Sequence, residues 1–357
     1  MDRPNILGKI AALSGKHILK QSPASYVEGF VDALMNVYPA ESLETVLQQK
    51  FHVPDETHYS DKTFCELACE LTVANHVKLT GSPNFEAEKK LNPPSDKDVD
   101  AFCSVGSHHV AVEVKCPELS IDEYDSANPI FKISFMGRYP DHEQKFEELR
   151  KLTGSAMQVE KAKRLDNKLK DYLVSAHNKF RNPSQPGDAN VLFVALDDYY
   201  SMQEWNGYLF SDFGGFFGPR PYLKREEFQQ VDVVILSNLQ SAHTIGRAYH
   251  DWTLRNIYMI PRITGNPRPG LDDHTVAAAL RLFPHELSGF GAFQPYSGLD
   301  DNLWTAAEFT KITHYAVEKL PDADRKRYFP VPTSRMKATA ESAARSETEK
   351  VTPSIGT

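Results

Sequence analysis

Apolar and polar positions alternate most regularly between residues 98 and 115, and this pattern predicts a β-hairpin. The two expected strands, residues 98–105 and 108–115, are joined by Gly106-Ser107, a dipeptide suited to a two-residue turn. Such a loop fixes the register, because residues that face one another must then have numbers that sum to 213. The apolar face carries the pairs Cys103 with Val110, Ala101 with Val112 and Val99 with Val114, next to Val105 with His108.

The opposite face of this hairpin is polar and charged. It pairs Ser104 with His109, Phe102 with Ala111, Asp100 with Glu113 and Asp98 with Lys115. Two facing carboxylates, with Cβ atoms roughly 5 Å apart, repel each other and destabilise a sheet. Lys115 supplies one positive charge on this face, and a divalent cation between Asp100 and Glu113 would supply the rest. We therefore expect one face to be core and the other to carry chemistry; the alternative is that the Glu and Lys form only a solvated face.

Asp100 near the start of one strand, with Glu113-Val114-Lys115 at the end of the next, resembles the core motif of the PD-(D/E)xK nuclease superfamily. The resemblance covers roughly residues 60–260 at the level of fold, but only the Asp and Glu-x-Lys positions at the level of motif. The Pro-Asp dipeptide of the family is replaced by Asp98-Val99-Asp100, and the register favours Asp100 over Asp98. The resemblance implies an α/β fold with a restriction-endonuclease-like mixed sheet of about four to five strands, flanked by helices, with helical N- and C-terminal additions.

The resemblance also implies roles for individual residues. Asp100 and Glu113 would bind Mg²⁺, or alternatively Mn²⁺, with the backbone carbonyl of Val114 as a further ligand. Lys115 would orient the attacking water or help to deprotonate it. In the superfamily a helix before the first motif strand often presents a glutamate to the metal site, and Glu70 would fill this position and help to bind a second ion.

A helical pattern over residues 60–77 lies in the right place to supply that glutamate. Ser60 or Asp61 is a suitable N-cap, and apolar residues recur on one side of the predicted helix. Glu66 and Glu70 are four residues apart and share a face. We favour Glu70 as the site residue and keep Glu66 as the second choice; both could instead be exposed helix glutamates.

The rest of the pattern divides the chain into four parts. Residues 1–58 predict a helical region of two or three helices, and residues 59–263 form the expected nuclease-like core. Within the core we expect a loop at 79–97, a long helical pattern at 142–180 with Gly154 as a candidate break, interior strands at 190–196 and 231–236, and an edge strand at 256–261 ended by Pro261. Residues 264–330 predict a C-terminal helical region, and residues 331–357 a disordered tail.

Two groups of basic residues are candidates for nucleic-acid contacts. Lys161, Arg164 and Lys168 recur at helical spacing and would lie along one face of the helix at 142–180. Arg220 and Lys224 accompany the phenylalanines of the Gly-rich segment 208–228, whose rings could stack on bases. The alternatives are a solvated charged helix and a loop whose aromatic side chains fold back into the core.

Composition narrows the class of protein. Of the 357 residues, 41% are hydrophobic and 25% are charged, which is typical of soluble globular proteins. No stretch approaches the roughly 20 apolar residues of a membrane span, and the N-terminus has no long apolar segment, so we expect a cytoplasmic protein without a membrane partner. The four cysteines predict buried thiols. A net charge of −8 argues against coating nucleic acid by bulk charge, although a local basic surface would suffice.

The sequence motifs of P-loop nucleotide-binding proteins and of serine hydrolases are absent. The sequence therefore favours a metal-dependent nuclease that hydrolyses phosphodiester bonds of nucleic acid, and more specifically a DNA endonuclease with a role in restriction, repair or defence. DNA is the expected partner, and cutting both strands would favour a homodimer. The alternative is a catalytically inactive nuclease-fold module that binds nucleic acid or another protein.

Overall fold

A computed structural model describes residues 1–283 apart from 81–83, 93–95, 118–129, 134–143, 145–146, 149–150, 152–157, 162–164, 182–183, 198, 211–214, 218–220, 222, 245, 256, 258 and 264–267. Among the described residues, no helix combines the length and the apolar character needed to cross a membrane. The tail expected at 331–357 and most of the helical region expected at 264–330 lie outside the described residues.

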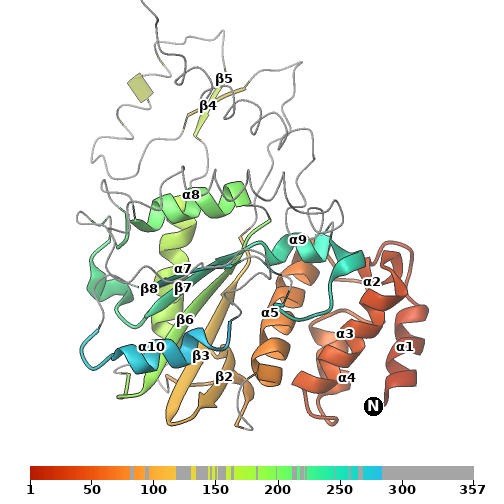
Figure 1. The fold of residues 1–357 in the computed structure, drawn as a ribbon. Helices are drawn as coiled ribbons and strands as arrows, with labels where there is room; N and C mark the ends of the chain where they lie inside the picture. Colours follow the sequence, from red (N-terminus) through yellow and green to blue (C-terminus); the bar gives the residue numbers. More distant parts are fainter. Residues whose placement is uncertain are drawn as a thin grey trace, which may run out of the picture.

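A six-stranded mixed sheet lies at the centre of the α/β fold (Figure 1), where about four to five strands were expected. The strands, in sheet order, are Glu86–Lys89 (β1), Val99–Val105 (β2), His108–Lys115 (β3), Asp188–Ala195 (β6), Val233–Ser237 (β7) and Met259–Ile263 (β8). β3, β6 and β7 are parallel, and the three remaining pairings are antiparallel. β8 is the predicted edge strand, but Pro261 lies inside it, opposite Ile235, and does not end it.

The hairpin of β2 and β3 has the predicted register. Its five pairs run from Ala101 with Val112 to Val105 with His108, and every pair has numbers that sum to 213. Gly106 adopts a positive φ of 61°, which the first central position of a tight two-residue hairpin turn requires and which glycine tolerates without strain. Continuing the register toward the start of β2 places Asp100 across from Glu113.

Strand β1 corrects the prediction of a loop at 79–97. It pairs with β2 in antiparallel fashion, with Ala87 opposite Ala101 and Lys89 opposite Val99. The segment is only four residues long and rich in Glu and Lys, so its composition carries little strand signal. Charged residues are nevertheless common on edge strands, where they discourage pairing with a second chain.

Both faces of the sheet are covered by helices. The helices are Arg3–Ala11 (α1), Ile18–Gln21 (α2), Ala24–Val37 (α3), Leu43–Gln49 (α4), Asp61–Thr80 (α5), Leu165–Lys179 (α7), Tyr199–Phe210 (α8), Leu239–Thr244 (α9) and Asp273–Leu280 (α10), with short 3₁₀ turns at Arg225–Phe228 (η2) and Arg247–Tyr249 (η3). One hydrophobic cluster joins α1–α5, α9 and α10 to one face. A second joins α7, α8 and η2 to the other.

The expectation of one core face and one chemical face was wrong. Phe102 and Ala111, which share a face with Asp100 and Glu113, are buried in one cluster with Leu173 of α7. The reason is topological: β3 and β6 are parallel, so the chain between them must cross over the sheet, and α7 belongs to this crossover. The charged residues Asp100 and Glu113 therefore lie beside apolar side chains that this layer of helices covers.

The N-terminal region contains four helices, where two or three were expected. They lie on one side of the sheet, next to α5 and α9 (Figure 1), and share a hydrophobic cluster with α5. Gly29 allows α3 to pack directly against the buried Trp252, because a Cβ atom at position 29 would lie 2.6 Å from Cδ1 of Trp252. Helix α5 begins after Ser60, whose hydroxyl accepts a hydrogen bond from the Thr63 backbone N–H, as expected of an N-cap.

The helix predicted over 142–180 is wrong at residues 158–161, whereas its described residues 144, 147–148 and 151 are helical. Strand β5 (Gln158–Lys161) pairs in parallel with β4 (Ile130–Ile133) in a separate two-stranded sheet, and α7 begins only at Leu165. Strand pairing has overridden a pattern that, read locally, is compatible with helix. Lys161 therefore lies on a strand and does not share a helix face with Lys168.

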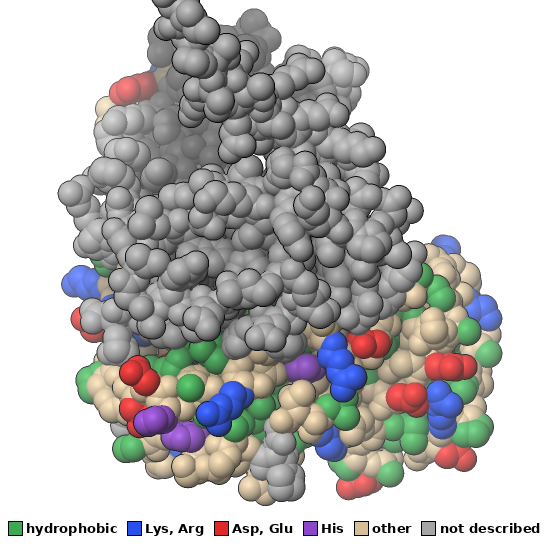
Figure 2. Space-filling model, in the orientation of Figure 1, with side chains coloured by type: hydrophobic (Ala, Val, Ile, Leu, Met, Phe, Trp, Pro, Cys, Tyr) green, Lys and Arg blue, Asp and Glu red, His purple; other side chains and the backbone are tan. Residues whose placement is uncertain are grey.

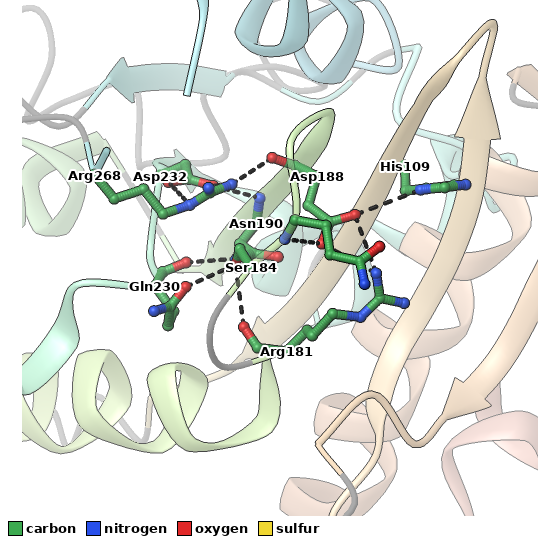
Figure 3. A network of polar contacts seen from close by, with 9 residues as sticks. His109, Arg181, Ser184, Asp188, Asn190, Gln230, Asp232 and Arg268 are labelled. Atoms are coloured by element: carbon green, nitrogen blue, oxygen red, sulfur yellow. Dashed lines mark hydrogen bonds and ion pairs between the residues drawn. The ribbon is translucent and has the colours of Figure 1, made fainter. Parts of the chain in front are cut away.

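A buried polar network lies around the amino ends of β6 and β7 (Figure 3). Arg268 is 4% exposed, and its Nε lies 3.0 Å from Oδ1 of Asp232, which is wholly buried. Asp188 pairs with Arg181 at 3.2 Å and with His109 at 3.4 Å. This network joins the segment after β8 to the sheet, because Arg268 also donates a hydrogen bond to the Asp188 backbone carbonyl.

All four cysteines are free and buried, as predicted. Cys103 lies in β2, and Cys65 and Cys69 lie on α5 in the same hydrophobic cluster. Burial raises the pKa of the Cys103 thiol to about 12, so it stays protonated and acts as an apolar side chain.

Candidate active site

The candidate site is built around Glu113 of β3. Its side chain is wholly buried, yet it is surrounded by charged groups from both layers of helices and from the neighbouring strand. We call this set the acid–lysine cluster, and its members are Glu70, Glu88, Asp100, Glu113, Lys50, Lys115 and Lys179. Four carboxylates and three ammonium groups are thus gathered at one end of the hairpin.

Two lysines hold the Glu113 carboxylate. Lys115 lies two residues further along β3 and forms an ion pair with Oε1 of Glu113. Lys179, the last residue of α7, lies 2.7 Å from Oε1 and 2.9 Å from Oε2. The side chains of Lys115 and Lys179 are 21% and 13% exposed, so solvent screens these ion pairs only weakly.

Asp100 of β2 is the second carboxylate of the cluster. One of its oxygens accepts a hydrogen bond of 2.6 Å from the backbone N–H of Val114. Burial raises the pKa of Asp100 well above its usual range, and the charges of Glu113 and Glu70 raise it further against the opposing effects of Lys179 and this hydrogen bond. The charge of Glu113 thus disfavours ionisation of Asp100, as expected for two facing carboxylates.

Glu70 reaches the cluster from α5. Burial raises its pKa to about 7; Lys50 and Lys115 oppose this rise, and the Glu113 charge adds to it. The charge of Glu70 on α5 thus interacts with those of Glu113 and Asp100. A carboxyl that titrates near neutral pH is suited to exchanging protons in this pH range.

Glu88, Lys50 and Tyr38 form the outer part of the site. Glu88 lies on β1 between the residues that pair with Val99 and Ala101, which places it across from Asp100. Its Oε1 accepts hydrogen bonds from the Tyr38 hydroxyl at 2.7 Å and from Lys50 Nζ at 2.6 Å. Burial and the Glu88 charge raise the pKa of Tyr38, so its hydroxyl remains a donor. A groove of 710 Å³ between α3 and β1 reaches Tyr38 and Glu88.

The donor atoms of this cluster fit a hard divalent cation, because carboxylate oxygens are the ligands that Mg²⁺ prefers. Their arrangement is not that of an assembled metal site: in the part of the chain that the structure describes, no three His, Cys, Asp or Glu side chains converge as ligands. Both oxygens of Glu113 instead contact lysine ammonium groups. Asp100, Glu113, Glu70 and the Val114 carbonyl remain the predicted ligands.

Of the basic residues proposed for nucleic-acid contacts, the three that the structure describes lie on different elements. Lys161 lies on β5, whereas Lys168 is exposed on α7 with its ammonium 5.9 Å from the Tyr172 ring. Lys224 is exposed just before η2. Arg164 and Arg220 lie outside the described residues.

The aromatic segment 208–228 folds partly into the core, in agreement with the alternative interpretation. Phe216 is buried in the second cluster. Arg225 lies 5.6 Å from the centre of the Phe217 ring and 4.9 Å from that of Phe228, and it donates hydrogen bonds to backbone carbonyls. Arg225 is therefore a structural residue of this segment.

Four members or neighbours of the site were not predicted: Lys179, Lys50, Glu88 and Tyr38. Glu88 could have been found by extending the period-2 alternation to residues 86–89, because a third strand with the register of β1 brings it to Asp100. Lys179, Lys50 and Tyr38 come from helical regions or the residues that follow them, and their approach depends on how these elements pack, which local spacing does not encode.

Comparison with known proteins adds no assignment, since no protein-family model, no curated protein and no solved structure matches the chain significantly.

Proposed function

We propose that the protein is a metal-dependent nuclease of the PD-(D/E)xK type, with DNA as its substrate. The observation that carries this proposal is the wholly buried Glu113 carboxylate, which has Asp100 and Glu70 beside it and forms ion pairs with two lysines. Burying each charge costs several kcal/mol even after relaxation, so such clusters are uncommon without a role. Strongly shifted pKa values that arise from burial and specific charged neighbours occur preferentially at functional sites.

Each residue has a role that its position supports. Asp100 and Glu113 would hold Mg²⁺ or Mn²⁺, with the Val114 carbonyl as a further ligand and Glu70 toward a second ion. The bound ion would supply Lewis acidity and a more acidic water. Lys115 orients the attacking water and offers positive charge to the phosphate. Glu70, with its pKa of about 7, is suited to take up or release a proton.

The substrate class follows from charge and location. A phosphodiester is an anion, and Lys115 and Lys179 are the partly exposed cations at the buried carboxylates. Over the N-terminal helices, Figure 2 shows acidic and basic side chains interspersed. Contacts with DNA therefore depend on local groups near the site, as the net charge of −8 requires. Cutting both strands calls for two such sites, which we propose a homodimer supplies.

The test is cleavage of defined nucleic acids by the purified chain. Supercoiled plasmid, linear duplex, single-stranded DNA and RNA would be incubated with Mg²⁺, Mn²⁺ or EDTA. We expect DNA cleavage with either ion and none in EDTA. Cleavage of RNA alone would show that RNA, and not DNA, is the substrate. Cleavage that persists in EDTA would overturn the metal-dependent mechanism.

A second candidate function is a catalytically inactive module that binds nucleic acid or a protein. It is favoured by one observation: the lysines already neutralise Glu113, so the cluster is electrically satisfied without a metal. This alternative predicts DNA binding without cleavage under every metal condition. Binding and cleavage of the same labelled duplex, measured in parallel, separate the two functions.

A further inference from the structure

We infer that Lys179 is a positioning residue of the candidate site, which holds Glu113 by occupying the place of a divalent cation and must give way when that cation binds. This inference rests on the proposed function, because it concerns the same carboxylates. It adds Lys179 of α7 to a site whose predicted residues lie on the hairpin and on α5.

The first support is the geometry of the contact. The Lys179 ammonium lies within 3 Å of both Glu113 oxygens, at 2.7 and 2.9 Å, and Lys115 takes a further place on Oε1. A carboxylate has about four lone-pair directions, and bonds to charged donors are the strongest that it makes. A divalent cation that binds Glu113 must therefore share these oxygens with the Lys179 ammonium or displace it.

The second support is the position of Lys179 at the end of α7. It is the last residue of the helix, and the next residue, Phe180, is buried in the hydrophobic cluster that anchors this end. The backbone is thus fixed, while a four-carbon side chain can move its ammonium by several Å through rotamer changes alone. Exchange therefore requires no rearrangement of the helix.

The third support is the presence of other anions for the displaced ammonium. Asp100 and Asp98 both act on Lys179 in addition to Glu113. Asp98, which the register ranks below Asp100 as a ligand, is a further carboxylate whose charge acts on the Lys179 ammonium.

The test compares Mn²⁺ binding by the full chain and by variants, measured by calorimetry in metal-free buffer. Lys179→Met and Lys179→Gln keep the length of the stem without the charge, Lys179→Arg keeps the charge, and Lys168→Met is a matched control on the exposed side of the same helix. We expect roughly tenfold tighter Mn²⁺ binding by the two uncharged variants, because a competing unit charge has been removed. Lys179→Arg and Lys168→Met should stay close to the wild type.

Circular dichroism and melting temperature identify the variants that fold. One folded uncharged variant is sufficient for the comparison of Mn²⁺ binding. A purely structural role for Lys179 predicts unchanged or weaker Mn²⁺ binding by a folded uncharged variant, and that result would overturn the inference while leaving the proposed function in place. Absence of Mn²⁺ binding by the wild type and by all variants would instead overturn the proposed function, and the inference with it.

Discussion

The ammonium of Lys179 lies 2.7 Å from Oε1 of Glu113, although the two residues are 66 positions apart and belong to a helix and a strand. This contact joins α7 to strand β3 of the sheet. It explains how a carboxylate with no exposed surface remains compatible with folding, since a buried charge is tolerated only when it is paired.

Replacing Glu113 should therefore destabilise the protein. Glu113→Gln leaves two partly buried lysines without their main anion, and we expect a loss of about 2–4 kcal/mol in unfolding free energy. Urea denaturation in EDTA measures this loss. Glu44→Gln, at a glutamate paired with Lys9 on the surface, is the control and should change stability little. Equal effects at the two positions would contradict the importance of burial.

Glu70 should make stability depend on pH. Its pKa is about 7 when folded and 4.5 ordinarily, so the folded protein binds this proton more tightly than the unfolded chain. Stability from this group is fully present below about pH 4.5 and is lost as the pH rises through 7. Glu70→Gln, which cannot ionise, should be about 2–3 kcal/mol more stable than the wild type at pH 8, without that gain at pH 4.

Denaturation curves at both pH values, recorded in EDTA so that cations do not mask the effect, measure this difference. A hydrogen bond from Lys9 lowers the pKa of Glu44, so Glu44→Gln should bring no gain at pH 8. If Glu70→Gln has the same stability relative to the wild type at both pH values, Glu70 is not held in the environment described above.

Two glycine-to-alanine substitutions should have opposite effects on the stability of the protein. At Gly29 a new Cβ would lie 2.6 Å from Cδ1 and 3.3 Å from Nε1 of Trp252, so Gly29→Ala should cost about 1–3 kcal/mol. At Gly8, within α1, nothing lies within 4 Å of the added atom. Gly8→Ala should stabilise the protein by about 0.5–1 kcal/mol, because alanine favours helix. Thermal denaturation compares the two variants, and a stabilising Gly29→Ala would refute this packing.

The buried pair of Arg268 and Asp232 should be worth more than a similar pair on the surface. Arg268→Met leaves Asp232 wholly buried without its main partner, and we expect a cost of about 3–5 kcal/mol. Arg3 and Asp32 form an exposed pair at 3.0 Å, and Arg3→Met should cost less than about 1 kcal/mol. Chemical denaturation measures the loss of unfolding free energy for both variants. A smaller loss for Arg268→Met than for Arg3→Met would contradict this prediction.

Much of the sheet could be predicted from the sequence because its strongest signals are local. A two-residue turn at Gly106-Ser107 fixed the register of the hairpin, and thereby placed Asp100 across from Glu113. Continuous apolar runs likewise identified β6 and β7, whose residues are buried throughout. Turn chemistry and burial on both faces leave a clear trace in a single sequence.

The features that were missed depend on pairing and packing at a distance. Strand β1 carries Glu88 but is too short and too charged to be recognised without its partner β2. Strand β5 lies in a segment that reads as helix until β4 is placed beside it. Lys179 belongs to a helix whose approach to Glu113 is set by the crossover between β3 and β6, and no local spacing reports that approach.

The most direct test of the central claim is Mg²⁺-dependent cleavage of supercoiled plasmid by the wild type and three variants. Lys115→Ala removes the lysine that would act on water and phosphate, Asp100→Asn removes a predicted ligand, and Lys16→Ala removes an exposed lysine outside the proposed site as the control. We expect the first two to lower the cleavage rate at least roughly 100-fold, the range typical for loss of a catalytic group, and the control to match the wild type. Cleavage by folded Lys115→Ala and Asp100→Asn at the wild-type rate would contradict the account.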